Sequence, residues 1–552
     1  MREVICDVLV IGAGAAGARA VVAAQQHPGI HVALAVKGKL GKSGASTFWV
    51  TEAAGYGAAD GRRNTSDNPN THYQDILLAA RGMCDADVAR TLTEHAPDSV
   101  RELTKYGVTF ERQDGDYLIT QGCYASTPRN YNLRRHGSQI VDALYRHFDT
   151  DRLTMLEDTM IVKLIVRSGR CVGAVGVTSE GEYIVINAKA TVLTSGGAGQ
   201  LFRFALNPNE ITGDSYALGY EAGAELMNME FMQTGCGILH PRFLILNSWI
   251  WSLYPKLTDM LGESVIAPVL PKGVTEKQIM DAKSTHYPFG SRTLSRYLEI
   301  GMQKAIAAGR VGPNGGVFLD ARDAFTAGHS SGLQLFDDMW RLTNNWYLSQ
   351  GIDVANQVIE VACFAHAING GLRIDSNAYT NVPALFAAGE AASGPHGADR
   401  LGGNMLPACV VFGSIAGKEA AELAMRTEQP VFTSFMPESF VSSVDGPKGT
   451  ELIARLQRLM FDNLMVVRSA EKCARLKSEL AALKVQADNA CFEDASPWMP
   501  YNLRNMLLVA GMMLEAVERR KESRGSHFRE DFPHEEPAYA LPFAFSKHTL
   551  TV

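Results

Sequence analysis

VLVIGAGAAG, at residues 8–17, indicates a β-strand, a glycine-rich turn and the start of an α-helix close to the N-terminus. In a dinucleotide-binding unit the first glycine, Gly12, permits the tight turn, and Gly14 lets a diphosphate approach the backbone. Gly17 lets the helix pack close to the strand, and the diphosphate lies at the N-terminal end of the helix. Glycine turns also join strands to helices for structural reasons alone, so the rest of the chain has to decide between the two interpretations.

The composition is that of a globular protein. Of the 552 residues, 46% are hydrophobic and 20% are charged, which excludes a disordered or fibrous chain. No apolar run reaches the roughly 18 residues of a membrane span, and the chain enters its first strand without a secretory leader, so we expect a cytoplasmic location. The net charge of −7 and the lack of a long basic run argue against a nucleic-acid partner.

The nine cysteines are scattered along the chain and form no CxxC pair. This spacing predicts neither a disulfide scaffold nor an intrinsic iron–sulfur or zinc site, so no metal site is expected. Most of the cysteines are expected to be buried, reduced thiols.

The segments after the first helix extend the pattern. Residues 31–36, HVALAV, predict a second parallel strand that completes a βαβ unit. It is followed by Lys37, where a nicotinamide-binding domain usually has Asp or Glu for the ribose, so a plain NAD site is disfavoured. The loop at 38–47 is rich in small and hydroxyl residues, which suits either a flat or phosphorylated ligand or an exposed loop. A second glycine turn, TVLTSGGAG at 191–199, is also suited to a cofactor.

The character of the sequence changes twice. Between 236 and 355 aromatic residues accumulate and glycine turns become rare, which predicts an inserted domain. These aromatics either pack the core of that domain or face an aromatic or apolar substrate. From 429 onward the spacing of the apolar residues is helical.

Three further segments are more specific than any single turn. They are NPNEITGD (207–214) with AGAELMNMEFMQ (222–233), VPALFAAGEAA (382–392) with HGADRLGGN (396–404), and ESRGSHFREDFP (522–533). Together with the N-terminal turn and SGGAGQ (195–200), they resemble the flavoprotein family of succinate dehydrogenase, fumarate reductase and L-aspartate oxidase. The resemblance covers most of the chain, and 236–355 is the part that matches poorly.

This resemblance implies an α/β fold whose cofactor is FAD. A Rossmann-like FAD-binding domain of the glutathione-reductase type would consist of residues 1–235 and 356–428. An α+β capping domain would be inserted at 236–355, and a helical domain would follow at 429–552. The segment 522–533 is expected to be structural, tying the helical domain to the FAD-binding domain or to a partner.

The family pattern can be carried onto individual residues. The N-terminal glycines would hold the FAD diphosphate, Lys37 stands where the family often has lysine, and Asp214 and Glu390 would reach the cofactor. The loop after the second strand and residues 404–406 would lie near the flavin ring. The expected FAD-binding set is Gly12, Gly14, Ala15, Ala16, Gly17, Lys37, Ser43, Gly44, Ala45, Ser46, Thr47, Ile161, Ser195, Gly196, Gly197, Asp214, Glu390, Asn404, Met405 and Leu406.

Departures from the family pattern bear on the reaction. Members with covalent flavin carry a histidine in the loop after the second strand, where this chain has Gly44, so we expect non-covalent FAD. After EFMQ (230–233) the family usually has FHPT, whose histidine contacts the dicarboxylate substrate, whereas this chain has TGCG (234–237). The capping-domain TE and RGEG signatures are not recognisable either. Activity on succinate or L-aspartate is therefore not expected.

His366, Arg400 and His396 remain as candidates for catalysis. An arginine can hold a carboxylate or polarise a carbonyl, and a histidine can exchange a proton near neutral pH. The alternatives are that His366 is a structural histidine and that Arg400 belongs to a structural ion pair. Arg292 and Arg296 could replace the missing capping-domain arginine, although surface ion pairs are the simpler role for both.

The sequence therefore predicts an FAD-dependent oxidoreductase that moves a hydride between the flavin and a carbon next to an activated carbonyl, carboxylate or amine. Electrons would then pass to oxygen, a quinone or a separate iron–sulfur protein. Two alternatives stay open. The chain could be the flavoprotein component of a larger reductase that receives electrons from an iron–sulfur partner, or a relative that binds FAD without turnover.

Overall fold

A seven-stranded sheet forms the centre of the N-terminal region in the computed structural model, which describes residues 2–326, 334–431, 440, 442–443, 445–493 and 495–547. The strand order is β8-β2-β1-β11-β10-β9, with β19 paired to β11. β1 runs parallel to β2 and β11, whereas β9, β10 and β11 form an antiparallel meander. The strands are β1 (Arg2–Ile11), β2 (Val32–Ala35), β8 (Leu153–Leu156), β9 (Thr159–Arg167), β10 (Arg170–Thr178), β11 (Tyr183–Leu193) and β19 (Leu385–Ala387).

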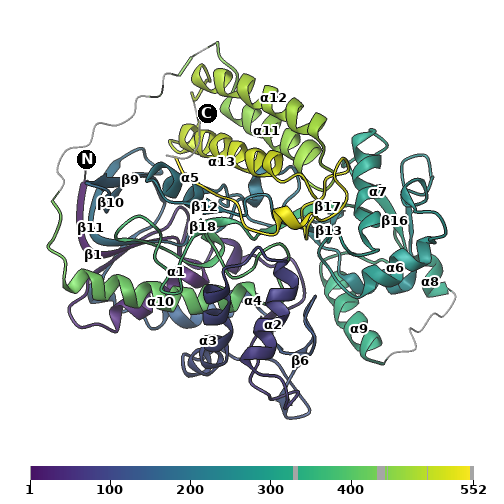
Figure 1. Cartoon of the computed structure of the whole chain (residues 1–552), viewed down its shortest axis with the longest axis horizontal. Helices are drawn as coiled ribbons and strands as arrows, with labels where there is room; N and C mark the ends of the chain where they lie inside the picture. The colour runs from purple at the N-terminus through teal and green to yellow at the C-terminus, as the bar shows by residue number, and fades with distance from the viewer. Residues whose placement is uncertain are drawn as a thin grey trace.

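Two helices with small residues pack on this sheet. Every residue of α1 (Ala15–Gln25) is buried, and α10 (Met405–Met425) lies against it. A Cβ at Gly413 would lie 2.5 Å from the Ala16 carbonyl oxygen, so α10 approaches α1 more closely than a larger residue would allow. Figure 1 shows both helices beside β1 and β11. The predicted βαβ unit, with β2 inside the expected 31–36, is therefore present.

Smaller elements cover the edges of this region. Asn68 and Asp85 cap α2 and α3 by accepting hydrogen bonds from backbone N–H groups of the first helical turn. The helices are α2 (Pro69–Ala80), α3 (Ala86–Lys105), α4 (His136–Tyr145) and α5 (Asp214–Glu221). The short sheets are β3 (Ala54–Gly57), β7 (Asn130–Leu133) and β6 (Ile119–Thr120), then β4 (Arg112–Gln113) with β5 (Asp116–Tyr117), and β20 (Ala392–Ser393), β18 (Gly371–Arg373), β12 (Leu226–Met227) and β21 (Ala544–Phe545).

The inserted region is built on a five-stranded sheet of order β14-β13-β17-β16-β15. The expected border at 235/236 falls inside β13, and the border at 355/356 falls just before β17, although these two strands pair with each other. Figure 1 shows this region apart from the large sheet, with its helices around β13, β16 and β17. Its elements are β13 (Met232–His240), β14 (Leu244–Ile245), β15 (Lys256–Thr258), α6 (Glu276–Ser284), α7 (Arg296–Ala307), β16 (Val317–Asp320), α8 (Arg322–Thr326), α9 (Gln334–Ser349) and β17 (Ile359–Ile368).

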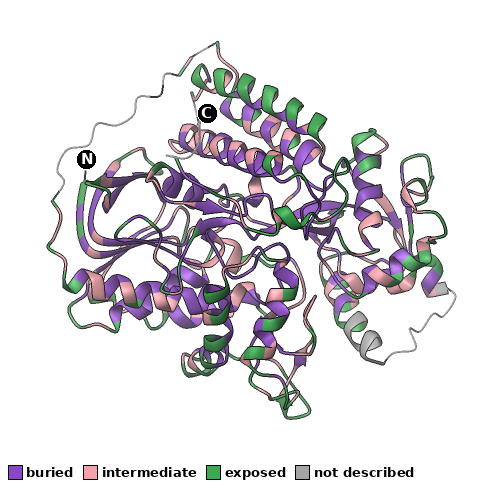
Figure 2. Cartoon of the chain, in the orientation of Figure 1, coloured by how far each residue is buried: buried purple, intermediate pink, exposed green. Residues whose placement is uncertain are grey.

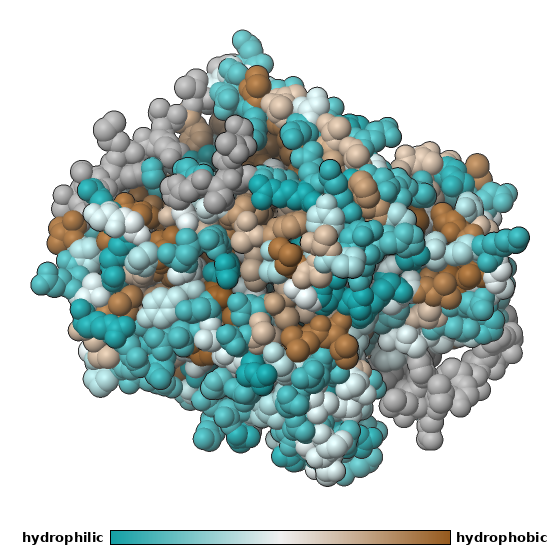
Figure 3. Space-filling view, viewed as in Figure 1, coloured by the Kyte–Doolittle hydropathy of each residue, from teal (hydrophilic) through white to brown (hydrophobic). Residues whose placement is uncertain are grey.

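The C-terminal region is helical, as the sequence predicts. It contains α11 (Gly449–Leu464), α12 (Ala470–Asp488) and α13 (Met499–Arg519). Figure 2 shows that α12 is exposed along its outer side, whereas α13, beneath it, is mostly buried or intermediate. Figure 3 shows hydrophilic side chains with scattered apolar ones on the visible face. Among the described residues, no helix is both long enough and apolar enough to cross a bilayer.

The segment at 522–533 lies between the helical region and the other domains. The fully buried Arg520 pairs with Glu230, which precedes β13, and its Nη1 is 2.9 Å from Glu522. Arg468 donates from Nη1 to the Glu230 carbonyl oxygen at 2.7 Å and contacts His527. These buried contacts hold the segment in place and match its expected structural role.

Candidate active site

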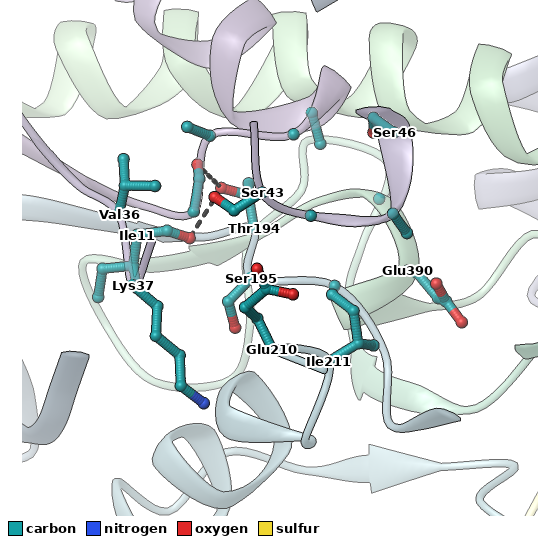
Figure 4. Close-up of a pocket in the computed structure, with 18 of the residues that line it drawn as sticks. Ile11, Val36, Lys37, Ser43, Ser46, Thr194, Ser195, Glu210, Ile211 and Glu390 are labelled. Atoms are coloured by element: carbon teal, nitrogen blue, oxygen red, sulfur yellow. Dashed lines mark hydrogen bonds between the residues drawn. The ribbon is translucent and has the colours of Figure 1, made fainter. Parts of the chain in front are cut away.

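A first cavity, with about 1110 Å³ of empty space, lies where β1, β2, β11 and α1 meet. Figure 4 shows Lys37 and Glu390 on opposite sides of its labelled residues. Sixteen of the expected FAD-binding residues line it: Gly12, Gly14, Ala15, Ala16, Lys37, Ser43, Gly44, Ala45, Ser46, Ile161, Ser195, Gly196, Asp214, Glu390, Met405 and Leu406. Lining residues that were not predicted include Val36, Thr159, Thr194, Glu210, Ile211, Leu218 and Cys409.

The glycine turn shapes one wall of this cavity. Gly12 has φ +102°, and a Cβ there would lie 2.5 Å from the Thr194 carbonyl oxygen. A Cβ at Gly17 would lie 1.8 Å from the Gly12 carbonyl oxygen, so this glycine allows the close approach of helix and turn. Helix α1 starts at Ala15 after Gly14, which has no side chain, and its first turn holds no acidic residue, while the Ala15 N–H donates to Ser46 Oγ at 3.0 Å. The N-terminal end of the helix is therefore suited to an anionic ligand, because no negative side chain there opposes one.

Lys37 and Asp214 line the cavity and also bind each other. Lys37 Nζ is 2.9 Å from Asp214 Oδ2 and donates to Thr212 Oγ1 at 2.9 Å and to Asn502 Oδ1 at 2.7 Å. Asp214 lies in the first turn of α5, and Asn502 lies on α13. The sequence predicted each residue separately, whereas the structure makes them one ion pair that links the cavity to the helical region.

Glu390 lies between the first cavity and a second one. Its Oε1 accepts a hydrogen bond of 3.0 Å from the Ile368 N–H. Burial raises the pKa of Glu390 to about 7, against the opposing effects of this hydrogen bond and of Arg400. A Cβ at Gly197 would lie within 3 Å of the Glu390 carboxylate, so that glycine makes room for the carboxylate and does not line either cavity.

The second cavity, with about 1160 Å³ of empty space, adjoins the first. Ala45, Ser46, Glu390, Met405 and Leu406 line both. Besides these, its lining includes Phe48, Val50, Thr51, Ala53, Ala54, Gly55, Cys123, His136, Gly137, Leu206, Asn207, Gln233, Ile245, Tyr287, Pro288, His366, Ala367, Arg400, Gly402 and Gly403. Two of the three predicted catalytic residues, His366 and Arg400, thus meet in one cavity next to the glycine-lined one.

Arg400 is held by its neighbours in a defined orientation. Its Nε donates to Gln233 Oε1 at 3.0 Å, and Gln233 Nε2 donates back to the Arg400 carbonyl oxygen at 3.2 Å. Nη1 donates to the Leu401 carbonyl oxygen at 3.4 Å, while Nη2 has no protein partner among the described residues. Gln233 was quoted in the family motif but was not predicted as a site residue.

His366 differs from the expected proton-exchanging histidine. Burial, and secondly the positive charge of Arg400, lower its pKa to about 3, so its imidazole is neutral at physiological pH. The ring packs edge-on against Tyr287, with centroids 5.5 Å apart. A neutral imidazole in this place is suited to hydrogen bonding with a ligand, not to carrying a proton at pH 7.

Several other predicted residues do not line either cavity. They are Gly17, Thr47, Gly197, Asn404 and His396. Thr47 Oγ1 donates to the Ser43 and Gly44 carbonyl oxygens at 3.1 Å and so stabilises its own loop. Asn404 Oδ1 lies 3.0 Å from His72 Nε2. His396 is buried, and burial followed by the charge of Arg400 lowers its pKa to about 3.

The two candidate capping-domain arginines also lie outside the lining of both cavities. Arg292 Nε is 3.8 Å from the buried carboxylate of Asp399, and its guanidinium lies over the Tyr124 ring at 5.1 Å. Arg296 donates to Tyr297 Oη at 2.9 Å and to the Ser291 carbonyl oxygen within its own turn. Arg296 therefore has a local role, whereas Arg292 has a buried partner.

The variant His396→Gln is expected to lose less of its free energy of unfolding than wild type does when the pH is lowered from 7 to 5. The folded protein leaves His396 unprotonated down to about pH 3, whereas the unfolded chain protonates it near pH 6.5. The contribution of His396 is therefore full above pH 6.5, and it falls by up to about 1.4 kcal/mol per pH unit below that. Urea unfolding at pH 7 and pH 5 measures the change, with His95→Gln at an exposed position as the matched control. Equal changes in wild type and His396→Gln would contradict the prediction.

Comparisons with known proteins agree with this arrangement. A family model described as "FAD binding domain" matches residues 7–247 and 303–406, and one described as "Fumarate reductase flavoprotein C-term" matches residues 453–552. One chain of the fumarate reductase (CoM/CoB) of Methanothermobacter marburgensis is 30% identical, over 97% of this chain and 96% of its own. The L-aspartate oxidase of Streptomyces coelicolor is 30% identical, over 96% of this chain and 89% of its own.

A solved structure extends the likeness to the whole fold. Mycobacterium smegmatis Sdh1 in complex with UQ1 has a TM-score of 0.83 and 27% identity, over 98% of this chain and 91% of its own. The family models cover more than half of the chain, and the matched residues include every residue that lines the first cavity except Cys409. The chain therefore belongs to the FAD-dependent oxidoreductase family of succinate dehydrogenase, fumarate reductase and L-aspartate oxidase flavoproteins, as its sequence predicts.

Proposed function

We propose that this chain transfers a hydride between non-covalently bound FAD and a small organic acid or carbonyl compound other than succinate. The observation that carries the proposal is the pair of adjoining cavities. One is lined by the glycine turn, and the other contains Arg400 and His366. A cofactor in the first and a substrate in the second would meet at the residues that line both.

The residues present fit FAD. The start of α1, which has no acidic residue in its first turn, is suited to the diphosphate, and Lys37 and Glu390 lie on opposite sides of the cavity. Gly44 offers no side chain for a covalent bond, and a Cβ there would meet nothing within 4 Å. When bound, FAD supplies the two-electron chemistry. The adjoining lining residues, from Ala45 to Leu406, are suited to holding its ring beside the second cavity.

Arg400 and His366 are assigned to substrate binding. In the oxidative direction the substrate would give up a hydride to FAD from one carbon and a proton from the next, and a carbon–carbon double bond would form. The carboxylate of Glu390, which lines the second cavity and whose pKa burial raises to about 7, would take the proton. The reductive direction reverses both transfers. Arg400 Nη2 is suited to binding a carboxylate or carbonyl oxygen next to the reacting carbons, because charged donors make strong hydrogen bonds in buried sites. Neutral His366 would hydrogen-bond the same group and keep its orientation.

A second candidate function is that of the flavoprotein component of a larger reductase. The relative from Methanothermobacter marburgensis is named as one of the chains of a fumarate reductase, and the likeness to it extends over nearly the whole of both chains. In that case an iron–sulfur protein would exchange electrons with FAD. Co-purification of the native protein from its source, followed by iron analysis of any associated chain, distinguishes this candidate from a stand-alone enzyme.

The visible absorption spectrum of the purified protein tests the proposal first. We expect a flavin spectrum that moves to the supernatant after acid precipitation, and anaerobically reduced enzyme that is reoxidised by an unsaturated acid. Flavin that stays with the precipitate would contradict non-covalent binding. A protein that takes up no FAD, or whose reduced flavin is not reoxidised by any acid or carbonyl compound of a broad panel, would contradict the proposed activity.

A further inference from the structure

The second cavity holds little permanent charge. Its ionisable lining residues are Cys123, His136, Tyr287, His366, Glu390 and Arg400. Burial raises the pKa of the Cys123 thiol and the Tyr287 phenol and lowers the pKa of both imidazoles, so these four groups are neutral at pH 7. Arginine stays protonated in proteins. Among the described lining residues, Arg400 is therefore the single permanent cation.

Arg400 itself has room for one acidic group. Gln233 and the Leu401 carbonyl oxygen already occupy its Nε and Nη1. Nη2 is the nitrogen that remains without a protein partner among the described residues. A second carboxylate on the same short ligand would have to lie in the cavity without a cation, and burying an unpaired charge is costly.

An aromatic ring fills the wall where β13 lacks side chains. A Cβ at Gly235 would lie within 3 Å of three atoms of the Tyr287 side chain, namely the ring atoms Cζ and Cε1 and the hydroxyl Oη. The ring therefore lies directly on the backbone of residue 235, the position at which the family usually has its substrate-contacting histidine. A polar contact is thus replaced by a flat apolar surface beside His366.

The ring is fixed in this place from several sides. Tyr287 Oη donates to the Cys236 carbonyl oxygen at 3.1 Å, and its N–H donates to Cys123 Sγ at 3.2 Å. Its carbonyl oxygen accepts a hydrogen bond of 2.6 Å from Lys283 Nζ, and Lys283 is paired with Glu299. Both members of this pair are fully buried. Such a pair fixes geometry more than it adds stability, so the Tyr287 segment is a preformed wall.

We propose that the second cavity selects a monocarboxylate with a flat apolar body, which Arg400 binds through the carboxylate and Tyr287 contacts along the body. The inference rests on the proposed function and names the substrate class of the same site. The apolar side chains of Phe48, Leu206 and Ile245 complete the lining along which such a body would lie. Short dicarboxylates are disfavoured because one of their two charges would find no cation there.

Equilibrium titration of the oxidised holoenzyme tests this inference without turnover. The flavin absorption change is followed with three ligands: trans-cinnamate, crotonate and fumarate. The three ligands share an unsaturated carboxylate and differ in one substituent. Crotonate has a methyl group at the position where fumarate has a second carboxylate and cinnamate has a phenyl ring. We expect cinnamate to bind at least about tenfold more tightly than crotonate, since its ring buries more apolar area. We expect fumarate to bind at least about tenfold more weakly than crotonate.

Two variants test whether the Tyr287 ring causes the preference for cinnamate over crotonate. Tyr287→Ala should weaken cinnamate binding about three- to tenfold and leave crotonate binding nearly unchanged, whereas Tyr287→Phe, which keeps the ring, should retain cinnamate binding. Fumarate binding as tightly as crotonate, or no spectral response to either monocarboxylate by FAD-loaded enzyme, would overturn the inference. If Tyr287→Ala does not fold, titration of the wild-type holoenzyme with the three ligands still tests the inference. Failure of the proposed function is separate, because it shows as absent FAD or as flavin that is not reoxidised.

Discussion

Arg400→Gln is expected to lower kcat/KM by roughly 10²- to 10³-fold and to weaken monocarboxylate binding strongly, while FAD content stays unchanged. Truncating one partner of a buried, hydrogen-bonded charge pair costs roughly 2–5 kcal/mol, which is about 30- to 5,000-fold in rate and contains the expected loss. Arg400 lies 8% exposed in the second cavity, and its contacts are to Gln233 and Leu401, not to the first cavity. Steady-state kinetics and flavin titration of the purified variant provide the measurement.

Arg400→Lys is the matched control for this prediction. Lysine retains the positive charge but lacks the planar fork that binds Gln233 and a ligand at once. We expect an activity between those of wild type and Arg400→Gln. Loss of FAD in parallel with activity would mean that Arg400 acts on the cofactor site, and full activity of Arg400→Gln would exclude it from substrate binding.

Gly17→Ala should lower the free energy of unfolding by about 3 kcal/mol or more and reduce FAD binding. The added Cβ would collide with the Gly12 carbonyl oxygen and lie 2.8 Å from Thr194 Oγ1, so the turn and the start of α1 would have to move apart. Because the diphosphate would bind at the same turn, both properties should change together. Urea unfolding of the apoprotein and FAD titration measure them separately.

Gly511→Ala is the control for that substitution. Gly511 lies inside α13, and a Cβ there would meet nothing within 4 Å. Since alanine favours a helix over glycine, this variant should be more stable by roughly 0.5–1 kcal/mol and should bind FAD normally. Equal effects of the two substitutions would show that the collision at Gly17 is relieved by local movement.

The glycine turn was predictable because its function depends on neighbours in sequence. Gly12, Gly14 and Gly17 act within one strand, one turn and one helix, and the structure places the three there. The pairing of Lys37 with Asp214 and Asn502 was not predictable, because it joins three segments that meet only in the folded chain. The residues of the first cavity could thus be predicted from local motifs, whereas the contacts between them are seen only in the folded structure.

The residues of the second cavity were harder to predict from the sequence than those of the first. The sequence indicated that the family histidine is missing near Gly235, but nothing in it showed that Tyr287 covers that glycine from another segment. It assigned His366 to the substrate site, but it placed His396 near the flavin and left open whether that histidine contacts substrate. Only burial and the cavity lining separate the two, with His366 inside and His396 outside. The aromatics of the inserted region could not be divided into core and lining from composition alone.

The pairing of β13 with β17 has a consequence for how such an enzyme can change. One strand carries Gln233 close to its start and the other carries His366 close to its end, and both positions adjoin the FAD-binding region. The pairing of the two strands therefore holds Gln233 and His366 close together at the edge of the FAD-binding region. None of the described residues at 241–358 lines the first cavity, whereas Ile245, Tyr287 and Pro288 line the second, so substitutions in this segment alter the substrate cavity and leave the lining of the FAD cavity unchanged.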